Sequence, residues 1–326
     1  MRIFAFLTLA ISFSAYAVIP LTGTGALPKG LDFGDPSPPK ISANKVEVFT
    51  TGGFILTWKN IDDLLSGKAA KLSHFKLQNA DEDIWDPNIT DGVLYGSVID
   101  GEGEDWSRRV YAFKNVNGKW VREPHPLSGP LPVQPTWLGH TYGHHIIDGY
   151  MFYEKVTEER NNSPWTTEIF ARKMKDAFHL TGPEIPILKL SQDWARARRS
   201  FGGKLVEGPR PFKASGIYFI SFSAGDYTSD DYGIHIMASK NLLGPYEPYL
   251  TPDKKDLKDF ASDIEKQMPL TWGGARAAFF EANNKHWALF HGIKDDGSSP
   301  EEQRNVWLSP VTIENCRDVH CQIKLK

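Results

Sequence analysis

Short runs dense in aromatic and β-branched residues alternate along this chain with turns rich in Asp, Asn and Gly. They recur in one form, in which an apolar lead-in, a polar turn and a strand-like run follow one another. Five stretches show it: "KISANKVEVFTT" (40–51), "ITDGVLYGSVI" (89–99), "HIIDGYMFYEKV" (145–156), "FKASGIYFISFSAG" (212–225) and "FFEANNKHWALFHG" (279–292). Neighbouring copies lie roughly 50 to 70 residues apart, which leaves each unit room for about four strands. The pattern predicts five repeated β units.

Repeated four-stranded sheets with little helix are typical of a β-propeller, because radial packing of the sheets leaves only short, protected edges. One helical pattern interrupts the strands, at 254–268, where Leu257, Phe260 and Ile264 recur at helical spacing. We therefore predict an all-β fold, a five-bladed β-propeller over 33–326 with a short helical insertion before the last blade. A β-sandwich or two stacked β domains is the alternative that a similar density of strands permits.

The N-terminal stretch "MRIFAFLTLAISFSAYA" has one Arg, an apolar run too short to span a bilayer and a small-x-small ending. This pattern predicts a secretory signal peptide over 1–17 that is cleaved from the mature protein. The Pro- and Gly-rich segment 18–32 is expected to form an N-terminal arm. No later stretch has the apolar length of a membrane helix. The mature protein is expected to be secreted or periplasmic, without a membrane contact.

Composition narrows the class of partner and the redox setting. The net charge is −3, with acids and bases interspersed, which gives no basic surface for nucleic acid. The two cysteines, Cys316 and Cys321, stand five residues apart in "NCRDVHC" and can close a small loop in an oxidising compartment. Free thiols are the alternative; a metal site with His320 falls short of the usual zinc pattern. We expect a monomer.

In a propeller the first strands of all blades direct their starts to one end of the central channel. The five lead-ins are "FGDPSPPKI", "DIWDPNI", "GHTYGHHI", "LVEGPRPFK" and "WGGARAAFF". The fold would therefore bring together Asp35, Asp86, His140 or His144, Glu207 and Arg276. Such convergence is what paired-carboxylate chemistry needs.

Glu207 lies between apolar neighbours, which disfavour the charged form of a carboxyl group and suit one that must hold a proton. Each acid also has a structural alternative. Asp35 stands in an Asp-Pro pair, which is common in turns, and Glu207 could be a buried acid paired with Arg210, Arg198 or Arg199.

The motifs around these two acids carry a resemblance to a known family. "GDPSPPKISANKVEVFTTGG" is similar to the first-blade motif of the family 43 glycoside hydrolases, the arabinanases, β-xylosidases and arabinofuranosidases. "VEGPRPFKASGIYFISFSAGDY" and its continuation to Pro245 resemble the fourth-blade motif of that family. The resemblance implies Asp35 as general base and Glu207 as general acid of an inverting glycosidase that cleaves a poly- or oligosaccharide.

The third blade departs from the pattern of that family, whose members carry there an Asp that orients the general acid. Counting back from Asp148, the matching position falls at about His140 or Thr141, and neither is acidic. Either His140 or His144 takes over this role, or Asp86 reaches in from the second blade. A catalytically altered or inactive propeller that binds glycan without cleaving it is the remaining alternative.

Sugar rings present apolar faces, so aromatic side chains beside the carboxylates are candidates for binding them. The predicted substrate-binding residues are Trp85, Arg210, Tyr227, Trp272 and Arg276. We expect no organic cofactor. A transition metal on His140, His144 and His145 is disfavoured, because strand alternation sends neighbouring histidines to opposite faces. The resemblance permits a calcium ion in the central channel, with His291 as a neighbour.

Overall fold

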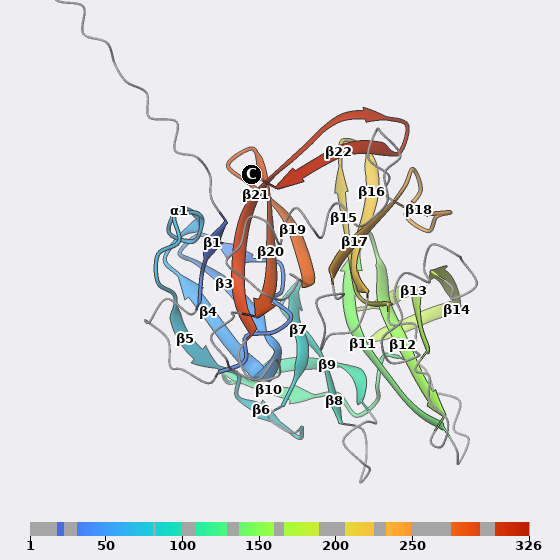
Figure 1. The fold of residues 1–326 in the computed structure, drawn as a ribbon. Coiled ribbons are helices and arrows are strands. Elements are labelled where there is room, and N and C mark those ends of the chain that lie inside the picture. The colour runs from blue at the N-terminus through green and yellow to red at the C-terminus, as the bar shows by residue number, and fades with distance from the viewer. Residues whose placement is uncertain are drawn as a thin grey trace, which may run out of the picture.

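The computed structural model describes residues 18–22, 31–80, 83–99, 108–128, 137–159, 166–188, 206–224, 233–248, 275–293 and 304–325. Five antiparallel sheets follow one another along the chain as the blades of a β-propeller (Figure 1). This confirms the predicted all-β, five-bladed fold. The expected signal peptide (1–17) and the helical pattern at 254–268 lie outside the described residues. Within the described ranges, no helix is long and apolar enough to cross a membrane.

Each blade is a consecutive meander, so chain order equals strand order within the sheet. Blade one consists of β2 (Lys40–Ser42), β3 (Lys45–Thr50), β4 (Phe54–Trp58) and β5 (Lys71–His74), with a short 3-10 turn η1 (Thr51–Gly53) and a short helix α1 (Ile61–Leu65). Blade two consists of β7 (Trp85–Thr90), β8 (Val93–Ile99), β9 (Arg108–Val116) and β10 (Lys119–Arg122), and β6 (Leu77–Gln78) adds to its outer edge in parallel with β10.

The remaining blades have the same plan. Blade three consists of β11 (Trp137–Ile147), β12 (Tyr150–Glu159), β13 (Thr166–Asp176) and β14 (His179–Leu188). Blade four consists of β15 (Val206–Ala214), β16 (Ile217–Ala224), β17 (Gly233–Ser239) and β18 (Glu247–Pro248). Blade five consists of β19 (Ala275–Ala282), β20 (Lys285–Ile293) and β21 (Arg304–Arg317), and its third strand also pairs with β1 (Ile19–Pro20) and β22 (His320–Leu325).

The hydrophobic core is divided among the interfaces between neighbouring blades. Phe49 of blade one packs with Leu94 of blade two, and Tyr95 of blade two packs with Met151 of blade three. Similar clusters join blades three and four, four and five, and five and one. Because a cluster also joins the last blade to the first, the ring is closed. Alternating side chains of each strand can thus be buried on both faces of a blade, which is why these strands are apolar on both faces.

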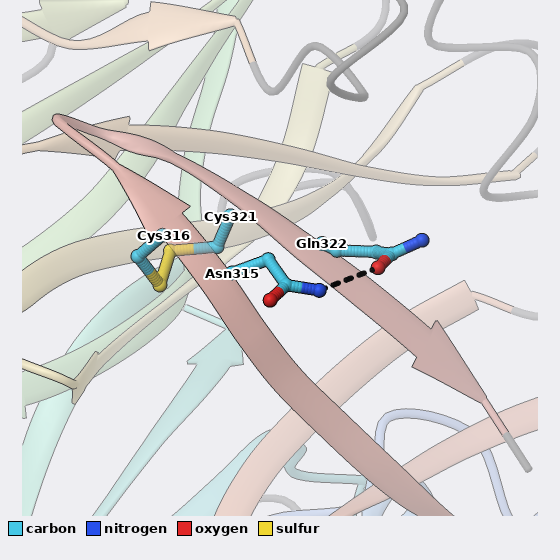
Figure 2. The surroundings of a disulfide bond; sticks show 4 residues. All are labelled: Asn315, Cys316, Cys321 and Gln322. Carbon is cyan, nitrogen blue, oxygen red and sulfur yellow. Dashed lines mark hydrogen bonds between the residues drawn. A yellow bond between two sulfur atoms is a disulfide. The ribbon is translucent and has the colours of Figure 1, made fainter.

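Two short strands strengthen the blade at which the ring closes. Ile19 pairs with Leu308, so β1 of the N-terminal segment joins the edge of β21, and Leu21 behind it is buried. At the other end, the β21–β22 hairpin reaches over blade four, where Val319 and Ile323 join the core shared by blades four and five (Figure 1). Cys316 and Cys321 form a disulfide near the tip of this hairpin (Figure 2).

Candidate functional site

The first strands of four blades carry the same irregularity in their pairing with the second strand. The register shifts between Trp85 and Asn88, Tyr142 and His145, Glu207 and Arg210, and Ala275 and Ala278. The first residue inside each shift has a positive φ, and so has Asp35 ahead of β2; the five residues are Asp35, Asp86, Gly143, Gly208 and Arg276. A bulge re-aims the side chain that it carries, and bulges are frequent next to active sites. The repeat thus places one such position on each blade.

The bulge identifies which residue of blade three is equivalent to the site residues of the other blades. The residue equivalent to Asp86 and Arg276 is Gly143, rather than His140 or Thr141 as counting from Asp148 predicts. The count from sequence misses it because the bulge adds residues to β11 that have no partner on β12. Glycine supplies the left-handed backbone here without a side chain.

Arg276 of blade five links three carboxylates. Its Nε lies 3.4 Å from Asp35 Oδ1, its Nη2 donates to Glu207 Oε2 at 3.1 Å, and its Nη1 lies 3.7 Å from Oε2 of Glu154. Its side chain packs against Gly208, where an added Cβ would stand 2.2 Å from Arg276 Cδ. The predicted convergence of Asp35, Glu207 and Arg276 is therefore present, with the guanidinium group between the acids.

Asp35 is held in its ionised form. Burial by itself would raise its pKa, but the guanidinium groups of Arg304 and Arg276 and a hydrogen bond from Thr51 outweigh burial and lower the pKa well below its usual value. The backbone N–H of Asp35 donates to Nδ1 of His291 at 2.9 Å. A carboxylate fixed in this way can accept a proton from water without changing its orientation first.

Thr51 couples the first two blades. Its hydroxyl donates to Asp35 Oδ2 at 2.6 Å and accepts the backbone N–H of Asp86 at 3.0 Å. Sequence reasoning missed this residue. The sequence gives little indication of a functional role for Thr51, because it stands at the end of a strand motif and looks like a structural threonine.

Asp86 forms a buried ion pair with Arg210, whose Nη2 donates to Asp86 Oδ1. Burial raises the pKa of Asp86 to about 6, against the attraction of Arg210 and Arg276. The same Arg210 Nη2 reaches the carbonyl oxygen of Asp35 at 3.4 Å. Arg210 thus connects blades one, two and four. It pairs with Asp86, whereas the structural alternative from the sequence paired it with Glu207.

Exposure separates the carboxylates of this cluster into two kinds. The side chains of Asp35 and Glu207 keep 10% and 8% of their surface accessible, whereas those of Asp86 and Glu154 keep 1% and 0%. A group that exchanges protons with a substrate must be reachable. All four residues are largely buried, but only Asp35 and Glu207 among them keep an appreciable accessible fraction.

Glu154 is a second residue that sequence reasoning missed. It lies in β12, the second strand of blade three, and its Oε2 accepts the backbone N–H of Gly208, the residue after Glu207. In "YMFYEKV" Glu154 stands two residues from Phe152 and two from Val156, both of which are buried. An acid among apolar strand residues can indicate a functional site. The sequence prediction, however, considered only the first strand of each blade, and Glu154 belongs to a second strand.

The predicted histidines take different places. His144 is fully buried, with its ring centroid 6.2 Å from that of Tyr95, and burial lowers its pKa to about 3. His140 lies in β11, and its side chain is outside the described part of the chain. Because His144 stays neutral above pH 5, it does not titrate near neutrality as an exposed imidazole would.

The aromatic candidates are only partly described. Trp85 begins β7, directly before Asp86; its Nε1 donates to Asp83, and the guanidinium carbon of Arg108 lies 3.9 Å from its ring centroid. One face of Trp85 is therefore covered by a cation. Tyr227 and Trp272 lie outside the described residues.

His291, the expected neighbour of a calcium ion, lies beside the Asp35 carboxylate and near three guanidinium groups. Nδ1 of His291 accepts the N–H of Asp35, and the nearby cations Arg304, Arg276 and Arg210 contribute, after burial, to lowering its pKa to about 3. Calcium prefers several oxygen ligands and a negative field. In the ranges that the structure describes, no three His, Cys, Asp or Glu side chains are grouped so that they could hold a metal ion.

Comparison with known proteins agrees with the architecture. The family model described as "Glycosyl hydrolases family 43" matches residues 97–315, about two thirds of the chain. A sequence search of curated proteins found no match.

Among solved structures, a thermostable family-43 glycoside hydrolase is similar, with TM-score 0.63 and 19% identity over 92% of this chain and 95% of that one. The α-L-arabinofuranosidase from Lactobacillus brevis has TM-score 0.63 and 15% identity over 94% and 95%. An exo-1,5-α-L-arabinanase from a bovine ruminal metagenomic library has TM-score 0.58 and 14% identity over 90% and 97%. At these identities the similarity concerns the fold.

Proposed function

Because this chain belongs to glycosyl hydrolase family 43 and is therefore a glycosidase, we propose that it cleaves O-glycosidic bonds of a poly- or oligosaccharide with inversion. Asp35 is the general base and Glu207 the general acid. The observation that carries the proposal is their contrast within one cluster. Asp35 and Glu207 are its two accessible carboxylates, and Arg276 contacts both of them.

The surroundings of Asp35 suit the role of a base. Asp35 faces Arg304, Arg276 and the Thr51 hydroxyl, all of which stabilise its negative charge. Glu207 contacts Arg276, which also lies near Asp35 and Glu154. A base must stay ionised through the reaction, and the cations and the hydroxyl around Asp35 favour its assignment as the base.

Two proton transfers accompany the proposed hydrolysis. Glu207 transfers its proton to the glycosidic oxygen as the bond from that oxygen to the anomeric carbon breaks. Asp35 takes a proton from a water molecule whose oxygen bonds to the anomeric carbon from the opposite face. Afterwards Glu207 is ionised and Asp35 is protonated, and exchange with solvent restores both. Inversion needs the carboxyl groups roughly 6.5–9.5 Å apart, so that the water fits between base and sugar.

The substrate side of the site is assigned to residues near these acids. Trp85 stands directly before Asp86 in the first strand of blade two, and we assign its indole ring to contact with a sugar ring. Arg276, which contacts both acids, is the proposed donor of hydrogen bonds to sugar hydroxyl groups. We propose no cofactor for the reaction and a monomeric enzyme.

Export is also part of the proposal. The N-terminal pattern over 1–17 indicates a signal peptide, and the Cys316–Cys321 disulfide suits an oxidising compartment (Figure 2). Mass spectrometry of the protein recovered outside the cytoplasm would then find an N-terminus at Val18. A product that still carries residues 1–17 would contradict cleavage.

The test of the function is a panel of polysaccharides and aryl glycosides, including arabinofuranosides and xylosides, because structural neighbours are described by these activities. The wild type should release sugar from at least one member, and Asp35→Asn should lower that rate by about 100-fold or more. Equal rates would remove Asp35 as base. Binding without release by the wild type would favour the glycan-binding alternative.

A further inference from the structure

We propose that Glu154 supplies the third carboxylate of this site and acts as a positioning residue for Glu207. The inference rests on the proposed function, since it assigns Glu207 as the general acid. It differs from the sequence-based options, which looked for the third group in His140, His144 or Asp86.

The space for Glu154 is created by Gly143. Gly143 has the left-handed backbone of the bulge position, and a Cβ on it would stand 2.6 Å from Oε2 of Glu154 and 2.9 Å from Cα of Gly208. Asp86 and Arg276 project a side chain from the equivalent bulges of blades two and five. Blade three instead leaves that space empty of its own first-strand side chain, and a carboxylate from its second strand occupies it.

Two contacts tie Glu154 to the acid. The backbone N–H of Gly208, directly after Glu207, donates to Glu154 Oε2, and Arg276 Nη1 lies 3.7 Å from the same oxygen. The first contact fixes the bulge from which Glu207 projects. The second places a negative charge on the guanidinium group that also contacts Glu207 at 3.1 Å. Since the Glu154 side chain is fully buried, it acts through these neighbours and does not touch the substrate.

The charge of Glu154 affects Glu207 through the charged groups around both residues. Four carboxyl groups from four blades, Asp35, Asp86, Glu154 and Glu207, face three guanidinium groups. These are Arg210 on β15, Arg276 on β19 and Arg304 on β21, and Arg304 is also paired with Asp32 at the edge of the site.

His144 and His291 stay neutral above pH 5, since burial lowers the pKa of each to about 3. Among the described side chains named here, carboxyl groups therefore outnumber guanidinium groups, and a proton on one carboxyl group reduces the excess negative charge. Without the charge of Glu154, Arg276 would be shared by Asp35 and Glu207, and the acid would release its proton more easily.

The experiment compares Glu154→Gln, which removes the charge but keeps an acceptor and the volume, with Glu154→Ala, which removes both. Glu184→Gln is the matched control, since Glu184 is a paired carboxylate of the same blade that contacts Tyr153 and Lys155.

In Glu154→Gln the alkaline limb of the kcat/KM profile should move by about one pH unit or more to lower pH, with KM little changed. The loss at pH 7 should be greater for poor leaving groups than for nitrophenolates. If the alkaline limb does not move, or if the rate falls equally for all leaving groups, the charge of Glu154 does not act on Glu207.

A second readout does not depend on catalysis and separates this inference from the function. Hydrogen exchange of the Gly208 amide, measured without substrate, should be faster in Glu154→Ala than in wild type and in Glu184→Gln. Unchanged exchange would overturn the positioning contact. If the wild type releases no sugar, the proposed function has failed, while the exchange of Gly208 still decides whether Glu154 holds the bulge.

Discussion

Gly143 and Glu154 compete for one space in blade three: a Cβ on Gly143 would stand 2.6 Å from the Glu154 carboxylate. Gly143 lies at the bulge of the first strand and Glu154 on the second strand opposite it, where it pairs with Tyr142. The absence of a side chain at one residue is therefore the condition for the burial of an acid at the other.

Replacing Gly143 by Ala should disturb this pair. The new Cβ would meet Glu154, the backbone of Gly208 and Arg276 at once, at 2.6 to 3.0 Å. Gly149→Ala is the control, because Gly149 also has a positive φ and nothing lies within 4 Å of an added Cβ.

We expect Gly149→Ala to cost about 1–2 kcal/mol of unfolding free energy, from backbone conformation. Gly143→Ala should cost more and reduce kcat/KM at least about tenfold, as measured by urea unfolding and kinetics. Equal effects of the two substitutions would show that the space beside Gly143 is not critical.

Replacing Glu207 by Gln should remove proton donation and leave the fold intact. The expected loss of kcat on glycosides with poor leaving groups is about 10²- to 10⁴-fold. Dinitrophenyl glycosides should lose much less, because their leaving oxygen needs no proton. Circular dichroism and the thermal midpoint monitor folding. A wild-type rate on a natural glycan, or the same loss for both classes of leaving group, would rule out Glu207 as the acid.

Replacing His144 by Gln should change the dependence of stability on pH. The folded pKa of His144 is lowered to about 3 by burial, below its unfolded value of 6.5, so acidification protonates the unfolded chain first. His144 therefore contributes stability above pH 6.5 that is lost as the pH falls toward 3.

For each pH unit of acidification between these two values, the unfolding free energy of the wild type should fall by about 1.4 kcal/mol relative to that of His144→Gln. Urea unfolding from pH 7 to 4 measures this, and the same substitution at the exposed His125 controls for loss of an imidazole. A difference that is independent of pH would mean that His144 is accessible to protons in the folded state.

The fold and the two accessible acids could be predicted because both are encoded in local repeats. The second strand of each blade begins after the same kind of polar turn, as at Val93 and Ile217, so the number of blades follows from the motif spacing. Asp35 and Glu207 stand beside the starts of such motifs, and the symmetry of a propeller brings those starts together.

The third carboxylate could not be predicted in the same way. Its place depends on how a bulge in β11 shifts the register and on which neighbouring strand fills the space beside Gly143. Both are properties of packing between strands, and the sequence of "YGHHIIDG" shows only a glycine among other candidates. The ion pair of Asp86 with Arg210 likewise joins blades two and four and leaves no local pattern.

The central claim is a single displacement at the anomeric carbon, with Asp35 activating water and Glu207 protonating the leaving oxygen. Proton NMR of the hydrolysis mixture, recorded within the first minutes and before mutarotation, tests it most directly on whichever glycoside the panel identifies. We expect the first sugar released to have the anomeric configuration opposite to that of the substrate. A first product with the substrate's own configuration would contradict it, because retention requires two displacements and a carboxylate nucleophile close to the sugar.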